Sequence, residues 1–336
     1  MSQMSKVSII VVNYNGGEIV GACLEALLRQ SYEAREVIVV DNNSCDGSLN
    51  DIQRIMKKDS TDSFNLISLN KNIGFAGANL EGLKHSNGDY TALLNPDAIA
   101  DSIWLEELVN ILESHPEVGI CASKMIANGN NVIDSAGDGY ATSLKGFKRG
   151  EGEKVERCNQ SEYVFGACAG AALYRREMLR EIAFLDEDFF LIHEDTDLNF
   201  RAQLHGWKVM YIPTAIVYHK VRSSIGKMSP MAIYYTLRNS EFVRIKNVPL
   251  GVFIRCFPEF IIGILTEFIY FAIKHKQLRL YLKAKIDAIR MLPKMLKKRA
   301  VIMKNRKVSN SYLLNIMTPL WQREVLGTKI KKVLYG

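Results

Sequence analysis

The chain has 336 residues, of which 48% are hydrophobic and 24% charged, so it is long enough to bury a large core and is neither disordered nor collagen-like. Its six cysteines include no CxxC pair, which argues against a zinc or disulfide framework and is typical of reduced thiols in a cytoplasmic protein. The net charge of +7 is unevenly placed: residues 274–307 hold 13 Lys or Arg and one acid, whereas residues 1–273 carry a net negative charge. A basic tail on an acidic body predicts a negatively charged surface as its partner.

Short β-branched runs alternate with helical patterns along the first 115 residues. The first run, VSIIVV, is too short for the core of a signal peptide, so we expect no cleaved leader. Continuous apolar strands between amphipathic helices predict an α/β fold with a mainly parallel central sheet flanked by helices. The predicted strands are 7–12, 36–40, 64–69 and 90–94, and the predicted helices are 18–30, 48–58, 74–85 and 102–115.

Polar residues follow all four predicted strands, at the edge where α/β sheets bind ligands. Turn formation and helix capping would explain any one of these turns, but they explain four turns on one edge less well. Neither GxGxxG nor GxxxxGK[ST] occurs, so the dinucleotide and P-loop fingerprints are absent. In chain order the turns contain Asn13-Tyr14-Asn15, residues 41–46, residues 70–74 and Asn95-Pro96-Asp97.

The middle of the chain is less regular. Residues 120–165 are rich in Gly and Asn, and we expect loops and short strands near the edge of the sheet. Small residues at 166–170 either allow close approach of a ligand or form a tight packing turn, and both readings stay open. A helix that contains Arg175 and Arg176 is expected to follow.

Three carboxylates occupy four positions in FFLIHEDTDLNFR (189–201), directly after a hydrophobic segment. Glu194, Asp195 and Asp197 are costly together unless water, cations or a ligand compensates them. Asp195 or Thr196 could cap the following helix, and acids favour a helix N-terminus. A cap needs only one acid, however, and no Glu or Gln completes a capping box. The run therefore predicts a functional acidic site.

Two further groups could converge with these acids. Asp97 ends the apolar run of the fourth strand, where its carboxylate is expected to point into the ligand crevice. His219 ends another apolar run, although a histidine in such a place is often only a hydrogen-bonded structural residue. Carboxylate oxygen and imidazole suit Mg²⁺ or Mn²⁺, whereas Asn95 adds only a neutral carbonyl oxygen.

Six motifs together resemble the family 2 glycosyltransferases with a GT-A fold, in particular their bacterial rhamnosyltransferase-like branch. They occur in the order of the family and cover about two thirds of the chain. Each motif alone is weak, and the set is specific. The motifs are VSIIVVNYNG (7–16), VIVVDNNSCDGS (37–48), NKNIGFAGANLEGL (70–83), ALLNPDA (92–98), FFLIHEDTDLNFRAQLHGW (189–207) and VYHK (217–220).

The resemblance implies a role for each matching residue. Asp195 corresponds to the catalytic base and Glu194 to its supporting neighbour. Asp97 corresponds to the metal-binding Asp of a DxD motif whose first Asp is replaced here by Asn95, and His219 corresponds to a third metal ligand. The implied cofactor is Mg²⁺ or Mn²⁺, and the implied donor is a dTDP- or UDP-sugar. Its implied binding residues are Asn13, Tyr14, Asp41, Asp46, Asn72, Gly74, Asn79 and Asn95.

The last third of the chain predicts a helical extension. We expect residues 1–230 to form the GT-A catalytic domain and residues 231–336 an amphipathic, basic, membrane-associating extension. The longest stretch of residues 249–276 without charge or Pro is 260–266, far short of the roughly 20 residues that a spanning helix needs. Pro258 is expected to start or kink a helix here.

The charged residues of this segment, Arg255, Glu259, Glu267 and Lys274, fall on one arc of a helix and leave a broad apolar face. A helix in a bilayer interface and a helix packed on the domain both fit this pattern. The basic stretch that follows favours an anionic membrane surface. Nucleic acid is not expected, because Tyr281 is the only aromatic residue among these charges.

These observations predict an inverting, metal-dependent transferase at the inner face of the cell membrane. It would move rhamnose or a similar sugar to a hydroxyl of a glycan or lipid-linked saccharide in cell-surface polysaccharide synthesis. Such a reaction needs one base for the acceptor proton and a cation for the leaving diphosphate. The alternatives are a polyprenyl-phosphate sugar synthase and a non-catalytic subunit of a polysaccharide assembly complex.

Overall fold

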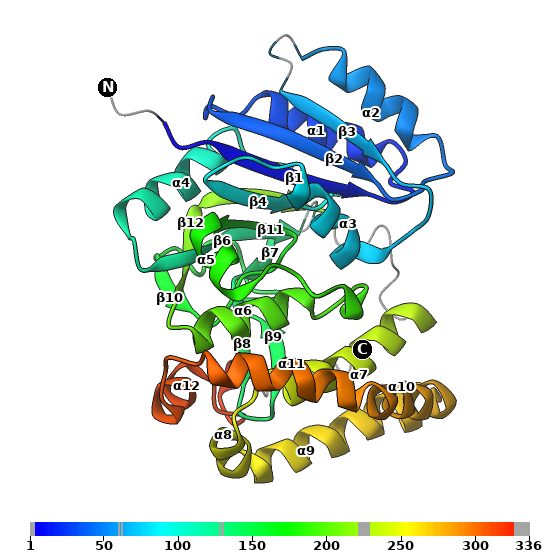
Figure 1. Ribbon diagram of the computed structural model, residues 1–336, viewed down its shortest axis with the longest axis vertical. Coiled ribbons are helices and arrows are strands. Elements are labelled where there is room, and N and C mark those ends of the chain that lie inside the picture. Colours follow the sequence, from blue (N-terminus) through cyan, green and yellow to red (C-terminus); the bar gives the residue numbers. More distant parts are fainter. Residues whose placement is uncertain are drawn as a thin grey trace.

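The computed structural model describes residues 4–325 except residues 60, 62, 128, 130 and 221–228. Within this part of the chain, a mixed sheet has the strand order β10-β12-β6-β11-β4-β1-β2-β3, with β5 paired to β12 and β7 to β6 (Figure 1). A separate hairpin is formed by β8 and β9. The strands are β1 (Val7–Asn13), β2 (Arg35–Asp41), β3 (Phe64–Ser68), β4 (Tyr90–Leu94), β5 (Ala98–Ala100), β6 (Val118–Ala127), β7 (Val132–Ala136), β8 (Asp138–Ala141), β9 (Lys145–Lys148), β10 (Glu162–Val164), β11 (Ala171–Arg175) and β12 (Lys208–His219).

The first half of the chain confirms the predicted α/β pattern. Strands β1 to β4 pair in parallel, and each is followed by its predicted helix, except that the short β5 comes between β4 and α4. These helices are α1 (Ile19–Leu28), α2 (Ser48–Met56), α3 (Gly74–Lys84) and α4 (Trp104–Ser114).

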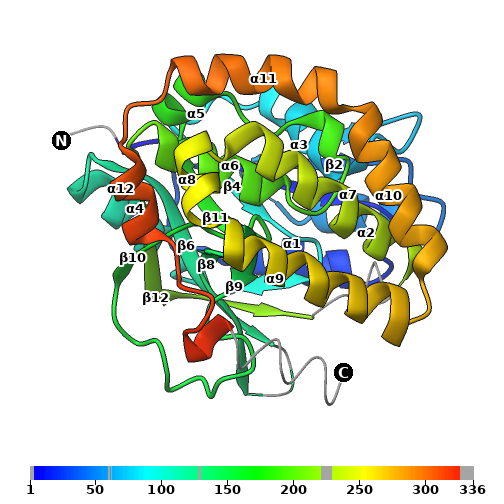
Figure 2. The ribbon, with the colours of Figure 1, turned by 90° about the horizontal axis from the view of Figure 1, so that it is seen from below.

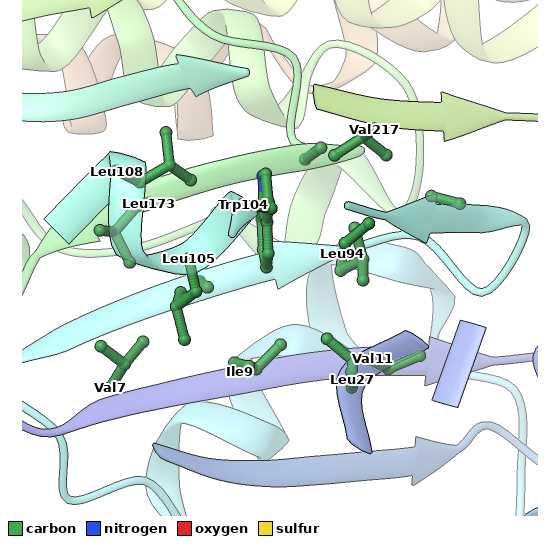
Figure 3. Close-up of a cluster of buried hydrophobic side chains, with 14 of the residues drawn as sticks. Val7, Ile9, Val11, Leu27, Leu94, Trp104, Leu105, Leu108, Leu173 and Val217 are labelled. Carbon is green, nitrogen blue, oxygen red and sulfur yellow. The ribbon is translucent and has the colours of Figure 1, made fainter. Parts of the chain in front are cut away.

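Side chains of β1 alternate between two cores on opposite faces of the sheet. Val7, Ile9 and Val11 pack with α1, α2 and α4 around Trp104 (Figure 3). Ile10 and Val12 pack on the other face with α3, α5 (Arg176–Ile182) and α6 (Glu194–Leu204). The sheet is therefore covered by helices on both faces, and its ligand edge is left to the turns.

The region after residue 115 corrects the sequence prediction in two places. Residues 118–127 form β6, a buried ten-residue strand inside the sheet between β11 and β12, rather than a loop or short strand at its edge. This strand was not recognised in the sequence because it contains polar residues that are buried with hydrogen-bond partners. The ammonium of Lys124 donates to the carbonyl of Val155, and Ser123 accepts a hydrogen bond from the Trp104 indole. Arg175 ends β11, so the helix predicted to contain it begins one residue later.

The last third forms a helical layer below the sheet (Figures 1 and 2). Its first helix packs against α6 and against two later helices, α10 and α11. Pro258 lies in the first turn of α9, as predicted. Within the described residues no helix is both long and apolar enough to cross a membrane. The helices are α7 (Pro230–Asn247), α8 (Leu250–Arg255), α9 (Phe257–Phe268), the π-helix η2 (Ile269–Lys274), α10 (Leu278–Arg290), α11 (Leu292–Lys304) and α12 (Asn310–Ile316).

Candidate active site

The turns after β1 and β2 are joined by a buried hydrogen-bond network. Asn13 is fully buried, and its amide donates to Asp41 and to Ser48, both at 2.8 Å. Asp46 accepts a hydrogen bond of 2.7 Å from the backbone N–H of Gly17. Tyr14 lies outside this network with 45% of its surface exposed. The network fixes the polar ends of two neighbouring parallel strands, where a base or ribose is expected to bind.

The turn after β3 is drawn into the same edge by Asn42, a residue the sequence prediction did not single out. Its side chain donates to Asn72 at 2.9 Å and accepts from the N–H of Ile73 at 2.9 Å. Gly74 has φ 78°, and a side chain there would lie 2.5 Å from Phe190, so glycine is required for this contact.

Asn79 is placed differently from the other predicted donor residues. It is 1% exposed and donates to the Phe75 carbonyl of its own helix at 2.8 Å, so its side chain is taken up within α3. Of the predicted donor-binding residues, only Asn95 lines the cleft described below.

A chain of alternating charges runs from Asp97 toward the hairpin β8–β9. Pairing of β5 with β12 brings the two predicted metal ligands together, with His219 Nε2 3.2 Å from an Asp97 oxygen. The other ring nitrogen lies 2.9 Å from Asp134, whose carboxylate also receives Lys148 at 2.8 Å. Burial alone would lower the pKa of His219, but these two carboxylates outweigh it and raise the pKa to about 9.

Asp97 and His219 fit a divalent cation as far as their chemistry goes. A carboxylate and a neutral imidazole are acceptable to Mn²⁺, and the carboxylate also to Mg²⁺, so His219 would release its proton when a cation binds. The second imidazole nitrogen already has a carboxylate partner, as metal-bound histidines commonly do. No group of three or more His, Cys, Asp or Glu in the described residues could hold a metal ion by itself. A cation here would therefore need further oxygen ligands, such as those of a nucleoside diphosphate.

The three carboxylates after His193 have three different environments. Asp197 is fully buried and is compensated by Lys246 and Asn247 at 2.8 Å and by Arg201 at 2.9 Å. Burial alone would raise the pKa of Asp197, but the charges of Lys246 and Arg201 outweigh this effect and lower the pKa below its usual value, so Asp197 stays ionised. It joins α6 to α7 and is not part of the open site.

Glu194 and Asp195 face the cleft. Glu194 is 6% exposed, and one of its oxygens, Oε2, has no hydrogen-bond partner among the described residues. Burial and the neighbouring Asp195 raise the pKa of Glu194 well above its usual range, which favours its uncharged form. Asp195 is partly exposed, and its oxygens accept from the N–H groups of Thr196 at 2.6 Å and Ala169 at 3.3 Å.

The backbone before these acids has an unusual conformation. Phe190, Ile192 and His193 all have positive φ, between 64° and 70°, which is uncommon for residues other than glycine. Asn239 of α7 compensates this loop, because its amide donates to the carbonyls of Phe189, Leu191 and Ile192 at 2.7 to 2.9 Å. Helix α6 then begins at Glu194, so the expectation that Asp195 or Thr196 would cap it was wrong.

A cleft of about 900 Å³ opens in front of Asp195. Of the predicted site residues, Asn95, Glu194 and Asp195 line it. Asp97 and His219 do not, and they are linked to the lining residue Lys148 only through Asp134. Its other walls are the hairpin β8–β9, the start of α7, the helices α9 and η2, and residues 320–325.

Sequence reasoning missed several charged groups at this cleft, among them the lining residues Asp138 and Lys148 and the partner of Lys148, Asp134. Burial together with the charge of Asp195 raises the pKa of Asp138 to about 8. The glycines of the GDGY segment were the only signal. The small residues before β11 fit both readings left open by the sequence: Cys168, Ala169 and Gly170 line the cleft, and a side chain at Gly170 would lie 3.0 Å from the Asn95 amide.

Known proteins similar to this chain agree on its class. Residues 8–183, about half of the chain, match the family model described as glycosyl transferase family 2. A poly-beta-1,6-N-acetyl-D-glucosamine synthase of Staphylococcus aureus (strain COL) is 22% identical over 227 residues, which are 67% of this chain and 52% of that protein. The corresponding synthase of Staphylococcus epidermidis is 22% identical over 265 residues, 76% of this chain and 61% of that protein. The chain thus spans about half the length of the curated relatives it matches.

Solved structures give the same fold. S. aureus TarS 1-349 has a TM-score of 0.58 at 18% identity, over 89% of this chain and 88% of that one. Mannosyltransferase PcManGT from Pyrobaculum calidifontis, solved with GDP-Man and Mn²⁺, has a TM-score of 0.51 at 17% identity, over 99% and 88%. The predicted α/β GT-A fold with a C-terminal helical region is therefore confirmed. The chain belongs to glycosyltransferase family 2.

Proposed function

We propose that this protein is an inverting glycosyltransferase that moves a sugar from a nucleoside diphosphate to a hydroxyl of a glycan or lipid-linked saccharide in cell-surface polysaccharide synthesis. The observation that carries the proposal is the position of Asp195. Its carboxylate faces a cleft of about 900 Å³, while of its two acidic neighbours Glu194 is buried and Asp197 is ion-paired with Lys246 and Arg201.

Asp195 is the proposed base. It would take the proton of the acceptor hydroxyl while that oxygen bonds to the anomeric carbon and the bond to the diphosphate breaks, which inverts the configuration. Burial raises the pKa of Glu194 and so disfavours a second negative charge beside the base. N–H groups from Ala169 and Thr196 keep the Asp195 carboxylate oriented toward the cleft.

The donor would lie along the carboxyl ends of β1 to β4, against Asn13, Tyr14, Asp41, Asp46, Asn72 and Gly74, with Asn95 next to the transferred sugar. Asp97 and His219 would hold Mg²⁺ or Mn²⁺, which would offset the charge of the leaving diphosphate. TarS has been solved with UDP-GlcNAc, which supports a UDP- or dTDP-sugar here. Rhamnose as the sugar, and the rhamnosyltransferase-like branch, rest on the sequence motifs alone.

The surface of the C-terminal helices supports a peripheral position at the inner face of the cell membrane. Large apolar residues of α8, α9 and η2 are exposed, and we call them the apolar face: Leu250, Ile254, Phe257, Ile261, Leu265, Phe268, Ile269 and Ile273. The basic residues 274–307 follow directly, and such a combination is attracted to anionic lipid.

The same observations favour this function over the two alternatives. The hairpin β8–β9, part of the long 120–190 region, walls a cleft of about 900 Å³ beside Asp195, which leaves room for a saccharide next to any lipid chain, whereas a polyprenyl-phosphate sugar synthase needs to hold only a phosphate there. A non-catalytic subunit has no need for a carboxylate held in the open cleft beside Asn95.

The test is release of nucleoside diphosphate from a panel of UDP- and dTDP-sugars, with membrane extract as acceptor and with or without Mn²⁺ or Mg²⁺. We expect metal-dependent release from one donor and its loss in Asp195→Asn. Asp51→Asn, on the surface of α2, is the matched control and should behave like the wild type. Full turnover by Asp195→Asn would contradict the proposed base.

A further inference from the structure

The lining of the cleft in front of Asp195 differs between the elements that form it. The hairpin β8–β9 contributes charged groups such as Asp138 and Lys148. Helices α9 and η2 and residues 320–325 contribute Thr266, Glu267 and Glu324 and also a set of apolar and aromatic side chains. We call this set the apolar mouth: Ile262, Tyr270, Phe271, Leu320 and Trp321. A sugar ring could stack on the aromatic members, but the aliphatic Ile262 and Leu320 offer a saccharide no polar partner.

Both walls of the apolar mouth are fixed to the hairpin β8–β9. The segment after α12 is held by backbone hydrogen bonds of 2.9 Å in both directions, from Thr318 to Tyr140 and from Thr142 to Thr318. Leu320 is 2% exposed and packs on Ala141. Across the mouth, α9 approaches the hairpin closely at Gly263, where a side chain would lie 3.1 Å from Ser143. The mouth is therefore a built part of the fold.

In helix α9 the carboxylate of Glu267 points into the protein, whereas several large apolar side chains point to the surface. Glu267 is 4% exposed and pairs with Lys145 and with Lys285, the latter at 2.7 Å. Ile262, Thr266 and Tyr270, spaced four residues apart, line the cleft, while the apolar face points to the surface. Ile262 and Trp321 are 36% and 62% exposed, so they belong both to the cleft and to the outer surface. The apolar lining of the mouth is thus continuous with the exterior.

We propose that the apolar mouth is a subsite for the alkyl chain of an amphiphilic acceptor, which enters the cleft from an anionic membrane surface. This rests on the proposed function, because it places the acceptor's hydroxyl at Asp195. Charge complementarity indicates the membrane: exposed Lys276, Arg279 and Lys283 follow the apolar face directly. A folded protein partner could cover the outer face, but only a thin chain could continue from there into the mouth.

A binding experiment tests the subsite without any turnover. Dansylundecanoic acid, a fluorescent alkyl chain with an anionic end, is titrated into the full-length protein. We expect saturable binding, weakened at least about tenfold by Ile262→Asn and by Trp321→Ala, since each removes apolar contact area from the chain. Ile289→Asn, on exposed α10 outside the cleft, is the matched control and should bind like the wild type. No saturable binding by the wild type, or equal binding by all variants, would overturn the proposal.

A second experiment separates the subsite from the function. Turnover is compared for membrane-borne acceptor and for the same glycan after chemical release from its lipid. We expect release from the lipid to lower kcat/KM at least about tenfold, and Ile262→Asn to lower it for the membrane-borne acceptor alone. Equal rates for both acceptors would refute the alkyl subsite and leave the transferase intact. Alkyl binding without turnover from any donor would instead refute the proposed function.

Discussion

Asn239 should control the rate of the reaction without touching either substrate. Its fully buried amide donates to three carbonyls of the positive-φ loop that leads to Glu194 and Asp195. Asn239→Ala removes these bonds, and the carbonyls of Leu191 and Ile192 would lose the side-chain donor that holds them. Leaving two buried acceptors unpaired costs about 2–4 kcal/mol of unfolding free energy. The loop is then expected to relax, and Asp195 to move with it.

Small displacements of a catalytic group have large kinetic effects, up to about 100-fold for 1 Å. We therefore expect Asn239→Ala to lower kcat about 10- to 100-fold at a temperature where the protein stays folded. The dissociation constant for the nucleoside diphosphate should change less than about twofold, since the donor turns are elsewhere. Steady-state kinetics and calorimetric titration measure the two quantities.

Ser240→Ala is the matched control for Asn239→Ala. It removes a buried polar group from the same helix, but among the described residues its hydroxyl bonds only to the carbonyl of Leu237 within α7. This variant should keep kcat within about twofold, because a single local hydrogen bond is worth only about 1 kcal/mol. If Asn239→Ala is destabilised and yet keeps the wild-type kcat, the assigned positioning role is wrong.

The remaining predictions concern the metal ligands, acid stability and packing. Asp134→Asn should weaken Mn²⁺ binding about 10- to 100-fold in the presence of UDP, measured by electron paramagnetic resonance, because the imidazole loses its carboxylate partner; unchanged affinity would argue against this site. Lys246 lowers the pKa of both Asp186 and Asp197 against the effect of burial. The two carboxylates therefore stabilise the folded protein fully above their unfolded pKa of about 3.9, and this stabilisation is lost as the pH falls further. Thermal melts from pH 7 to pH 3 should show this loss, and a smaller one in Asp186→Asn. Gly21→Ala adds a carbon in open space and should stabilise the protein by about 1 kcal/mol. Gly82→Ala would place its new carbon 2.7 Å from Ile10 and should destabilise the protein by about 1–3 kcal/mol. Denaturant titrations measure both, and equal effects would contradict the packing described for α3.

The first half of the fold could be predicted from the sequence because its two periodicities are undisturbed. Apolar runs such as VSIIVV are buried on both faces of a parallel sheet, and the intervening helices have one apolar side. Strand β6 was missed because Ser123 and Lys124 are buried with partners from distant segments, and a local pattern cannot contain such partners.

The residues of the candidate site likewise fall into those that the sequence could single out and those that it could not. Asn13, Asp41, Asp97 and Asp195 could be singled out because each follows a recognisable strand or motif. Asp134 and Asn239 could not be singled out, because each acts through a contact that is distant in the sequence. The partner of Asp134 is 85 positions away, and the partners of Asn239 are about 50 positions away. The orientation of α9 was also beyond prediction: of the charged arc seen in the sequence, only Glu267 is buried and ion-paired, whereas Arg255 and Lys274 are exposed.

The order in which the site's parts occur along the chain has a consequence for synthesis. The ends of β1 to β4 are complete within the first hundred residues, so a nascent chain can form the proposed nucleotide-binding edge early. The pair of Asp97 and His219, 122 residues apart, closes only when β12 joins β5, and the loop before Asp195 is held only after α7 has emerged. Because contacts so distant in sequence form slowly, catalytic competence should be the last property that the growing polypeptide acquires.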